Sequence, residues 1–222
     1  KLSNGVCSLR PNEDKLCFST VFIVDEQMNI KSEWIGKTII NSKRRFTYEE
    51  AQSIIENKQG DFAFELIKLN EFAKILRQQR MQKGALAFNK VEVKFRLDEK
   101  GKPLSVYFKE TKESNNLIEE FMLLANRRVA EYVGRHKAHQ PTKAFVYRIH
   151  DKPDPEKLRQ FKLFAKHWGF DISLRSQQQI SESINKMLDG IRYKPERDII
   201  ENMAIRSMAK AVYSTKNIGH YG

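Results

Sequence analysis

One predicted helix, residues 114–133, carries an acid and an amide whose types and spacing could serve a chemical site. At about 100° per residue, Glu119 and Asn126 fall on nearly the same line, at the margin of a broad apolar arc. A partly buried carboxylate is costly without a partner, so Glu119 should face a polar group, a metal ion or a wet cleft. The alternative is a rim residue that reaches water, and the helix alone leaves both interpretations open.

The apolar arc of this helix predicts that it packs against a core. Its members are Leu117, Ile118, Phe121, Met122, Ala125, Val129 and Val133. Glu120 is expected on the opposite, solvated face, together with Arg127 and Glu131. Of the two adjacent acids, only Glu119 is therefore predicted to be available to a site.

Two segments combine aromatic and basic residues in the pattern of a stacking site for single-stranded nucleic acid. Phe46 and Tyr48 follow the basic run "SKRR", and Phe88 lies in "QKGALAFNK". Each ring could instead be a core aromatic at the boundary of an element, because Phe and Tyr side chains are mostly buried.

Other phosphate and metal chemistries have no clear motif in this sequence. It lacks the Gly-rich loops of P-loop and dinucleotide-binding proteins and the G-x-S-x-G elbow of serine hydrolases. Two-metal phosphoryl chemistry needs several clustered carboxylates. Asp151 and Asp154 come nearest to such a cluster, but their spacing around Pro153 is typical of a turn that leads into a helix.

The remaining composition predicts a soluble protein of a reducing, cytoplasmic compartment. Cys7 and Cys17 are too few for a disulfide framework or a Cys-rich zinc site, and His136 with His139 is more typical of an exposed loop than of half a metal site. No membrane span or signal peptide is apparent. The 40 Lys and Arg against 28 Asp and Glu give a net charge of +12. This charge favours a polyanionic partner, nucleic acid first, although dispersed Lys residues also serve solubility.

The strands that must position these residues are predicted as two hairpins and one further strand. Period-two alternation over residues 16–24 and 34–40, with a turn at 25–29, indicates an antiparallel hairpin. A second hairpin surrounds the turn at residues 98–103, and "AFVYRIH" reads as a single strand.

The first helix is marked by a capping box, because Thr47 stands three residues before Glu50 and the helix would begin at Tyr48. Further helices are predicted over residues 64–86, from Pro155 to Gly169, and over residues 180–188 and 195–211. Strand pairs precede the helix-rich half without a Gly/Ser linker. We therefore predict one α+β domain, in which an antiparallel or mixed sheet made from hairpins packs with several helices.

Several local patterns then coincide in order along the chain: "CSLRPNEDKLCFS", "FTYEEAQSIIE", "GALAF", "NNLIEEFMLLANRRVAEYV", "VYRIHDKPDPEKL" and "SMAKAVYSTKNIGHYG". Together they resemble the catalytic (RNB) domain of the ribonuclease II / ribonuclease R family of processive 3′-to-5′ exoribonucleases, in particular its ribonuclease R branch. The resemblance covers nearly the whole chain.

The resemblance implies a Mg²⁺-dependent hydrolase that removes 5′-mononucleotides from the free 3′ end of single-stranded RNA. In that family the Asp cluster that binds Mg²⁺ precedes the "CSLRP" segment, and a catalytic arginine and OB-fold RNA-binding domains follow "GHYG". We therefore expect residues 1–222 to be the central portion of a single catalytic domain. The Mg²⁺ ligands would lie mainly outside it, so no metal ligand is assigned here and the fragment alone should be inactive.

The resemblance also assigns roles to individual residues. The first Glu of the "IEE" motif, an active-site carboxylate in the family, falls on Glu119. The Tyr of the "TYEE"-like segment, which lines the site near the scissile nucleotide, falls on Tyr48. The aromatic that closes "GALAF", which stacks on RNA bases at the 3′ end, falls on Phe88. Asn126 is added as a substrate-binding residue from the helical wheel alone.

The parent protein is expected to be monomeric. Two other hypotheses remain beside the exoribonuclease. One is a non-catalytic RNA-binding module or adaptor on the same fold, and the other is a basic structural domain with no role in RNA binding. The residues before Lys1 discriminate between the first two, because an intact Asp cluster favours the enzyme.

Overall fold

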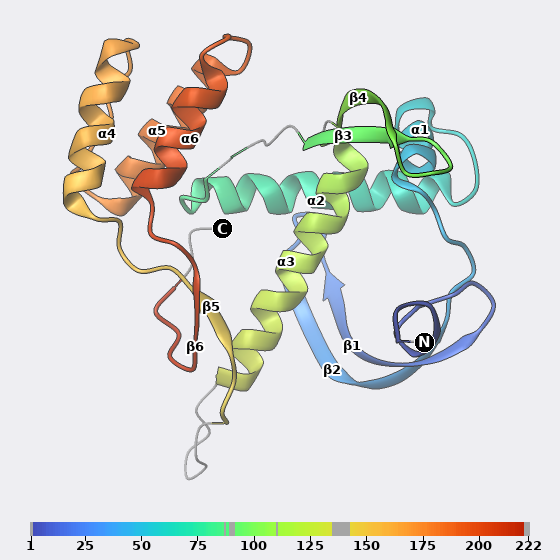
Figure 1. The fold of residues 1–222 in the computed structure, drawn as a ribbon. Coiled ribbons are helices and arrows are strands. Elements are labelled where there is room, and N and C mark those ends of the chain that lie inside the picture. Colours follow the sequence, from blue (N-terminus) through green and yellow to red (C-terminus); the bar gives the residue numbers. More distant parts are fainter. Residues whose placement is uncertain (1, 87, 89–91, 110, 135–142, 220–222) are drawn as a thin grey trace. The chain divides into compact units, whose positions relative to one another are not determined.

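The computed structural model describes residues 2–86, 88, 92–109, 111–134 and 143–219, which fall into two compact units (Figure 1). Unit 1 comprises Lys1–Arg77 and Thr111–Tyr132, and unit 2 comprises Gln78–Glu110 and Val133–Gly222. The units alternate along the chain, because each is assembled from two separate segments.

Unit 1 is built around one long antiparallel hairpin, drawn in blue in Figure 1. Its strands are β1 (Asp14–Val24) and β2 (Ile30–Asn41), in a register that sets Phe22 opposite Glu33. A short π-helical turn, Leu2–Val6, precedes the hairpin. The helices are α1 (Tyr48–Asn57), α2 (Ala63–Gln82) and α3 (Glu113–Gly134), of which α2 and α3 extend slightly beyond the bounds of the unit.

The turn of this hairpin contributes a buried side chain to the core of unit 1. Met28 has a φ of +61°, in the left-handed region, and is 5% exposed. It packs in one cluster with Leu76 of α2 and Leu124 of α3. Asp25 shapes the turn, since its Oδ1 accepts the backbone N–H of Asn29 at 2.8 Å. The turn therefore ties the hairpin to both helices.

The contribution of this turn to stability should decrease at acidic pH. Hydrogen bonds from Asn29, and the Lys31 ammonium 2.9 Å away, hold the pKa of the Asp25 carboxyl well below its usual range. Because the folded pKa is depressed, the stabilisation is complete above the unfolded value of about 3.9 and is lost as the pH falls through the folded value. Asp25→Asn should lower the thermal midpoint at neutral pH, and the gap from the wild type should narrow in acid. A gap that stays constant between neutral and acidic pH would contradict this account.

Unit 2 combines one small antiparallel hairpin, one antiparallel pair of strands that are distant in sequence, and three helices. The strands are β3 (Glu92–Leu97) paired with β4 (Pro103–Lys109), and β5 (Tyr147–Ile149) paired with β6 (Val212–Ser214). The helices are α4 (Pro155–His167), α5 (Gln177–Ile191) and α6 (Arg197–Ser207). Two of these helices start at side-chain caps, where the oxygens of Asp154 and Ser176 accept backbone N–H groups of the first turn.

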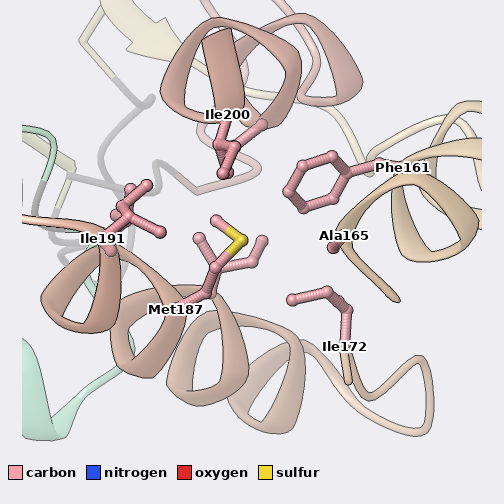
Figure 2. Packing of buried hydrophobic residues seen from close by; sticks show 9 residues of the cluster. Phe161, Ala165, Ile172, Met187, Ile191 and Ile200 are labelled. Carbon is pink, nitrogen blue, oxygen red and sulfur yellow. The ribbon is translucent and has the colours of Figure 1, made fainter. Parts of the chain in front are cut away.

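The three helices of unit 2 enclose its hydrophobic core. Apolar side chains from α4, α5, α6 and the α4–α5 connection point toward one another in Figure 2. Phe161 and Met187 are each 1% exposed, and Ala165 and Ile172 are fully buried. On α4 the buried positions Leu158, Phe161 and Ala165 recur every three or four residues, which is the period of one helical face.

The α+β fold class and the local signals of the sequence are confirmed. Both hairpins form, the Thr47 capping box starts α1, and Pro155 occupies the first turn of α4. Every sheet in the described part of the chain is a two-stranded antiparallel pair. The π-helical turn and β6 were not predicted. Among the described residues, no helix is both long and apolar enough to cross a membrane.

Candidate functional site

The two adjacent acids of α3 lie the opposite way round from the prediction. Glu120 is buried, with 3% of its surface exposed, and does not face solvent. Glu119 is exposed rather than partly buried at the margin of the arc. Ile118 and Met122, predicted to face the core, are 44% and 58% exposed. The buried side of α3 is therefore rotated by about one residue, near 100°, from the predicted arc.

Contacts with distant segments decide which side of α3 is buried. Leu124 lies just outside one edge of the predicted apolar arc, next to Leu117 in the helical projection, and packs with Met28 and Leu76. Arg128 fixes the same rotation, because its Nη2 and Nε lie 2.6 and 2.7 Å from Oε2 of Glu33 on β2. The predicted apolar arc is so broad that the sequence of α3 alone does not show which of its two edges distant residues would cover. The exposed edge is the one that carries Glu119.

Glu119 thus lies on an accessible face of α3 and is not partly buried as predicted. Asn126 is also exposed and lies seven residues further along the helix, on nearly the same line. Exposed Met122 lies beside both in the helical projection. An acid, an amide and an apolar side chain are therefore accessible together on α3.

The beginning of α1 is bonded directly to the beginning of α3. Tyr48 is the first residue of α1 and is 43% exposed. Its backbone carbonyl accepts a hydrogen bond from Ser114 Oγ at 2.9 Å, and Gln52 Oε1 accepts the Ser114 N–H at 3.0 Å. Gln52 and Ser114 are both buried. The structure thereby joins Tyr48 to the helix that carries Glu119.

The two partners in this junction should contribute unequally to stability. Gln52→Ala leaves the buried Ser114 N–H without its acceptor and should lower the free energy of unfolding by about 1–3 kcal/mol. Ser114→Ala removes a single hydrogen bond and should cost about 0.5–1.5 kcal/mol. Urea denaturation followed by circular dichroism measures both losses. Equal losses, or a larger loss for Ser114→Ala, would count against the asymmetry.

The other aromatic beside the basic run is held within unit 1. The Arg44 guanidinium lies 5.1 Å from the centroid of the Phe46 ring, and the Phe62 ring meets it edge-on at 6.3 Å. Hydrogen bonds from the backbone and hydroxyl of Thr47 lower the pKa of the Glu50 carboxyl. Phe46 therefore supports the segment that leads into α1.

Phe88 belongs to unit 2 and packs against its core. The ring is half-buried and contacts the cluster around Phe161, as does Leu86. Asn185 Nδ2 donates a hydrogen bond to the Ala85 carbonyl at 2.8 Å, which holds the preceding residues to α5. The ring thus has a structural role, and its stacking on RNA stays a prediction.

No metal centre can be built from the residues that the structure describes. Within those residues, no group of three or more His, Cys, Asp and Glu side chains could hold an ion. Asp154 caps α4, as its spacing predicted, and Asp151 accepts the N–H of Lys152. His136 and His139 lie outside the described residues.

The net charge of the chain is confined to one of the two units, which composition alone did not reveal. Unit 1 contains 15 Lys and Arg and 15 Asp and Glu, so its formal charge is zero. Unit 2 contains 25 Lys and Arg against 13 Asp and Glu, and therefore carries the whole excess of +12. A polyanion is attracted to unit 2 far more than to unit 1.

Comparison with known proteins places the chain in one family. The family model described as the RNB domain matches residues 1–222. Ribonuclease R of Aquifex aeolicus is 33% identical over 228 residues, which cover 100% of this chain and 32% of that protein. DIS3-like exonuclease 2 of Schizosaccharomyces pombe is 34% identical, with 96% of this chain and 24% of that protein covered. The chain thus spans about a third or less of the length of these relatives.

Solved structures share the fold. The structure of Mycoplasma genitalium RNase R in complex with ribose methylated single-stranded RNA matches with a TM-score of 0.86 at 24% identity, over 99% of this chain and 34% of that one. Some similar proteins are described as inactive. They include yeast Ssd1, a pseudonuclease, with a TM-score of 0.70 at 18% identity over 99% of this chain and 27% of that one. An inactive exonuclease DIS3L2 of Arabidopsis thaliana is 32% identical, over 99% of this chain and 23% of that protein.

Proposed function

This chain belongs to the RNB-domain family, and on that premise we propose that the protein it comes from is an exoribonuclease. It would hydrolyse single-stranded RNA from a free 3′ end and release 5′-mononucleotides. The observation that carries the proposal is the match of the RNB domain along residues 1–222, together with 33% identity to a ribonuclease R over the whole chain. The 222 residues would form the central part of one catalytic domain.

Each site residue has a role suited to its position. Glu119 offers an exposed carboxylate that can hold the attacking water by a hydrogen bond or accept its proton. Tyr48 has a half-exposed side chain at the start of α1, whose hydroxyl can donate to a phosphate oxygen. Asn126 shares the exposed line with Glu119 and can bind the same nucleotide through its amide. Phe88 would stack on a base at the 3′ end.

Mg²⁺ dependence is also part of the proposal. When bound, Mg²⁺ would stabilise the charge that develops on the phosphodiester oxygens. The described residues do not fit such an ion, because no group of three or more potential ligands lies close enough together among them. Its ligands are therefore proposed to lie in other parts of the protein.

The proposal is tested with the full-length protein and an RNA labelled at its 5′ end. In Mg²⁺ we expect progressive shortening from the 3′ end with release of 5′-mononucleotides, and no reaction when the 3′ end is blocked or EDTA is present. Internal cleavage, or cleavage that ignores the 3′ block, would refute the proposed polarity. The isolated 222 residues should not degrade RNA. If they degraded RNA in Mg²⁺, and lost that activity on Glu119→Ala, the proposal that the Mg²⁺ ligands lie outside these residues would be wrong.

Phe88 can be tested separately from its packing. Phe88→Ala in the full-length protein should weaken the hold on the RNA 3′ end by about 1–3 kcal/mol, but it also removes a ring that packs on the core. Phe88→Leu keeps apolar volume against that core and removes only the stacking surface. Both variants should therefore bind a 3′-ended RNA more weakly in an anisotropy titration. Normal binding by Phe88→Leu would leave Phe88 with a structural role alone.

A second candidate is an RNA-binding protein of the same fold without nuclease activity. It is favoured by the inactive relatives, one of them 32% identical over 99% of this chain. It predicts that the full-length protein binds single-stranded RNA but releases no mononucleotides, and that the segment before residue 1 lacks a cluster of Asp residues. Mononucleotide release by the purified protein excludes it.

A further inference from the structure

We propose that one face of the β3–β4 hairpin, formed by Lys94, Arg96 and Tyr107, is a second contact surface for single-stranded RNA. This face belongs to unit 2, whereas the site residues Glu119 and Tyr48 belong to unit 1. The inference rests on the proposed function for the identity of the polyanion. It adds a surface that binds the RNA strand but does not take part in its hydrolysis.

The register of the hairpin places these three side chains on one face. Lys94 pairs directly with Tyr107, and Arg96 pairs with Ser105. Side chains two residues apart in a strand point to the same side, and directly paired residues share a face. The Arg96 guanidinium carbon lies 5.7 Å from the centroid of the Tyr107 ring. The Tyr107 ring therefore shares one face of the hairpin with two cations, and all three side chains are exposed.

The opposite face of the same hairpin carries no charged side chain to attract a polyanion. It consists of Val93, Phe95, Leu97, Leu104, Val106 and Phe108, each more than half exposed. The hairpin therefore has one apolar face and one cationic, aromatic face. Phosphate groups are attracted to the cationic face, and on this face Tyr107 also offers a ring on which a base can stack.

The charge of the surrounding unit strengthens this assignment. Unit 2 carries the entire +12 excess of the chain, and Lys100 and Lys102 add two exposed cations at the turn of the hairpin. The hairpin also begins close to Phe88. Glu92 follows Phe88 by four residues, and four extended residues span at most about 14 Å. An RNA strand held at Phe88 therefore lies near the β3 end of this surface.

Stacking and phosphate contacts of this kind select a single strand. A base must be unstacked from its neighbours before its flat side can lie on Tyr107, and a duplex does not offer such a base. Every base has a stacking surface, so the surface reads no sequence. The ligand class is therefore single-stranded RNA of any sequence.

Unit 1 provides a matched control on its own hairpin. Lys37 of β2 is exposed and pairs directly with Phe18 of β1, which is 69% exposed. A cation therefore faces an exposed aromatic ring across two antiparallel strands, as Lys94 faces Tyr107. The difference is the net charge of the unit, which is zero around Lys37 and +12 around Lys94. Lys37→Gln reports the loss of one exposed cation outside the proposed surface.

The test uses the full-length protein in EDTA, so that the probe is not consumed, and a fluorescein-labelled oligouridylate in an anisotropy titration at several salt concentrations. Tyr107→Ala should weaken binding about 5- to 160-fold, the range for one lost stack, whereas Tyr107→Phe should bind as the wild type does. Arg96→Gln and Lys94→Gln should each reduce the slope of log affinity against log salt by about 0.7, the value for one lost phosphate contact on a single strand. Lys37→Gln should change neither affinity nor slope.

Several outcomes would overturn the proposal. One is wild-type affinity for both Tyr107→Ala and Arg96→Gln, and another is an equal loss of slope for Lys37→Gln. If Tyr107→Ala lowers the thermal midpoint, its binding loss is not informative and Arg96→Gln becomes the test. An unchanged slope of log affinity against log salt for Arg96→Gln would then refute the proposed surface. Mononucleotide release in Mg²⁺ is measured independently. If the variants bind RNA as expected but the protein releases no mononucleotides, only the proposed activity is refuted. If the protein releases mononucleotides but the variants bind RNA as the wild type does, only this surface is refuted.

Discussion

Glu119→Gln in the full-length protein is expected to slow mononucleotide release by about 10²- to 10⁴-fold, the usual contribution of one proton-transferring group, with little change in RNA affinity. Glutamine keeps the shape of the side chain but can neither accept the proton nor carry the negative charge. Because Glu119 is exposed, its replacement should not disturb the core. Single-turnover cleavage and anisotropy in EDTA measure the two quantities separately. Equal losses in both would show that Glu119 only binds RNA.

The adjacent acid provides the matched control. Glu120 is 3% exposed, so Glu120→Gln alters a buried polar group and should lower the free energy of unfolding by about 1–3 kcal/mol. The folded fraction of that variant should cleave RNA at the wild-type rate. If folded Glu120→Gln were inactive and Glu119→Gln active, the roles of the two acids would be exchanged.

Phe161→Ala is expected to lower the free energy of unfolding of unit 2 by about 3–5 kcal/mol. Phe161 is 1% exposed within the cluster in Figure 2, so its loss removes buried apolar surface and leaves a cavity. Phe161→Leu retains part of the volume and should cost much less. Denaturant unfolding of both variants measures the difference.

Hydrogen exchange identifies which elements are destabilised in Phe161→Ala. The buried clusters of the two units share no residue. We therefore expect amides of α4, α5 and α6 to lose protection in Phe161→Ala, while the β1–β2 hairpin keeps its protection. Equal loss of protection throughout the chain would show that the two units unfold as one.

Features encoded by neighbouring residues were predictable from the sequence. The capping box needs only Thr47 and Glu50, and the start of α4 needs only Asp154 and Pro155. Both hairpins follow from period-two alternation on either side of a polar turn. In each case the residues that determine the structure lie within a few positions of one another.

Features set by distant residues were not predictable. The rotation of α3 depends on Glu33, Met28 and Leu76, none of which is near Glu120 in the sequence. The helical wheel therefore assigned the wrong edge of the apolar arc to the core and placed Glu120 in solvent. The strand β6 is three residues long and exists because Tyr213 pairs with Arg148, far earlier in the chain. The net charge was visible at once, but its confinement to unit 2 requires knowing which segments fold together.

The alternation of the two units along the chain also sets the order in which they can form during synthesis. The core of unit 1 needs Met28, Leu76 and Leu124, so it stays incomplete until α3 has emerged from the ribosome. The buried core of unit 2 comes from residues 161–204, a continuous stretch whose mostly local contacts favour rapid folding. A nascent chain that stops between residues 78 and 110 lacks α3 as well as α4–α6, so it completes neither core.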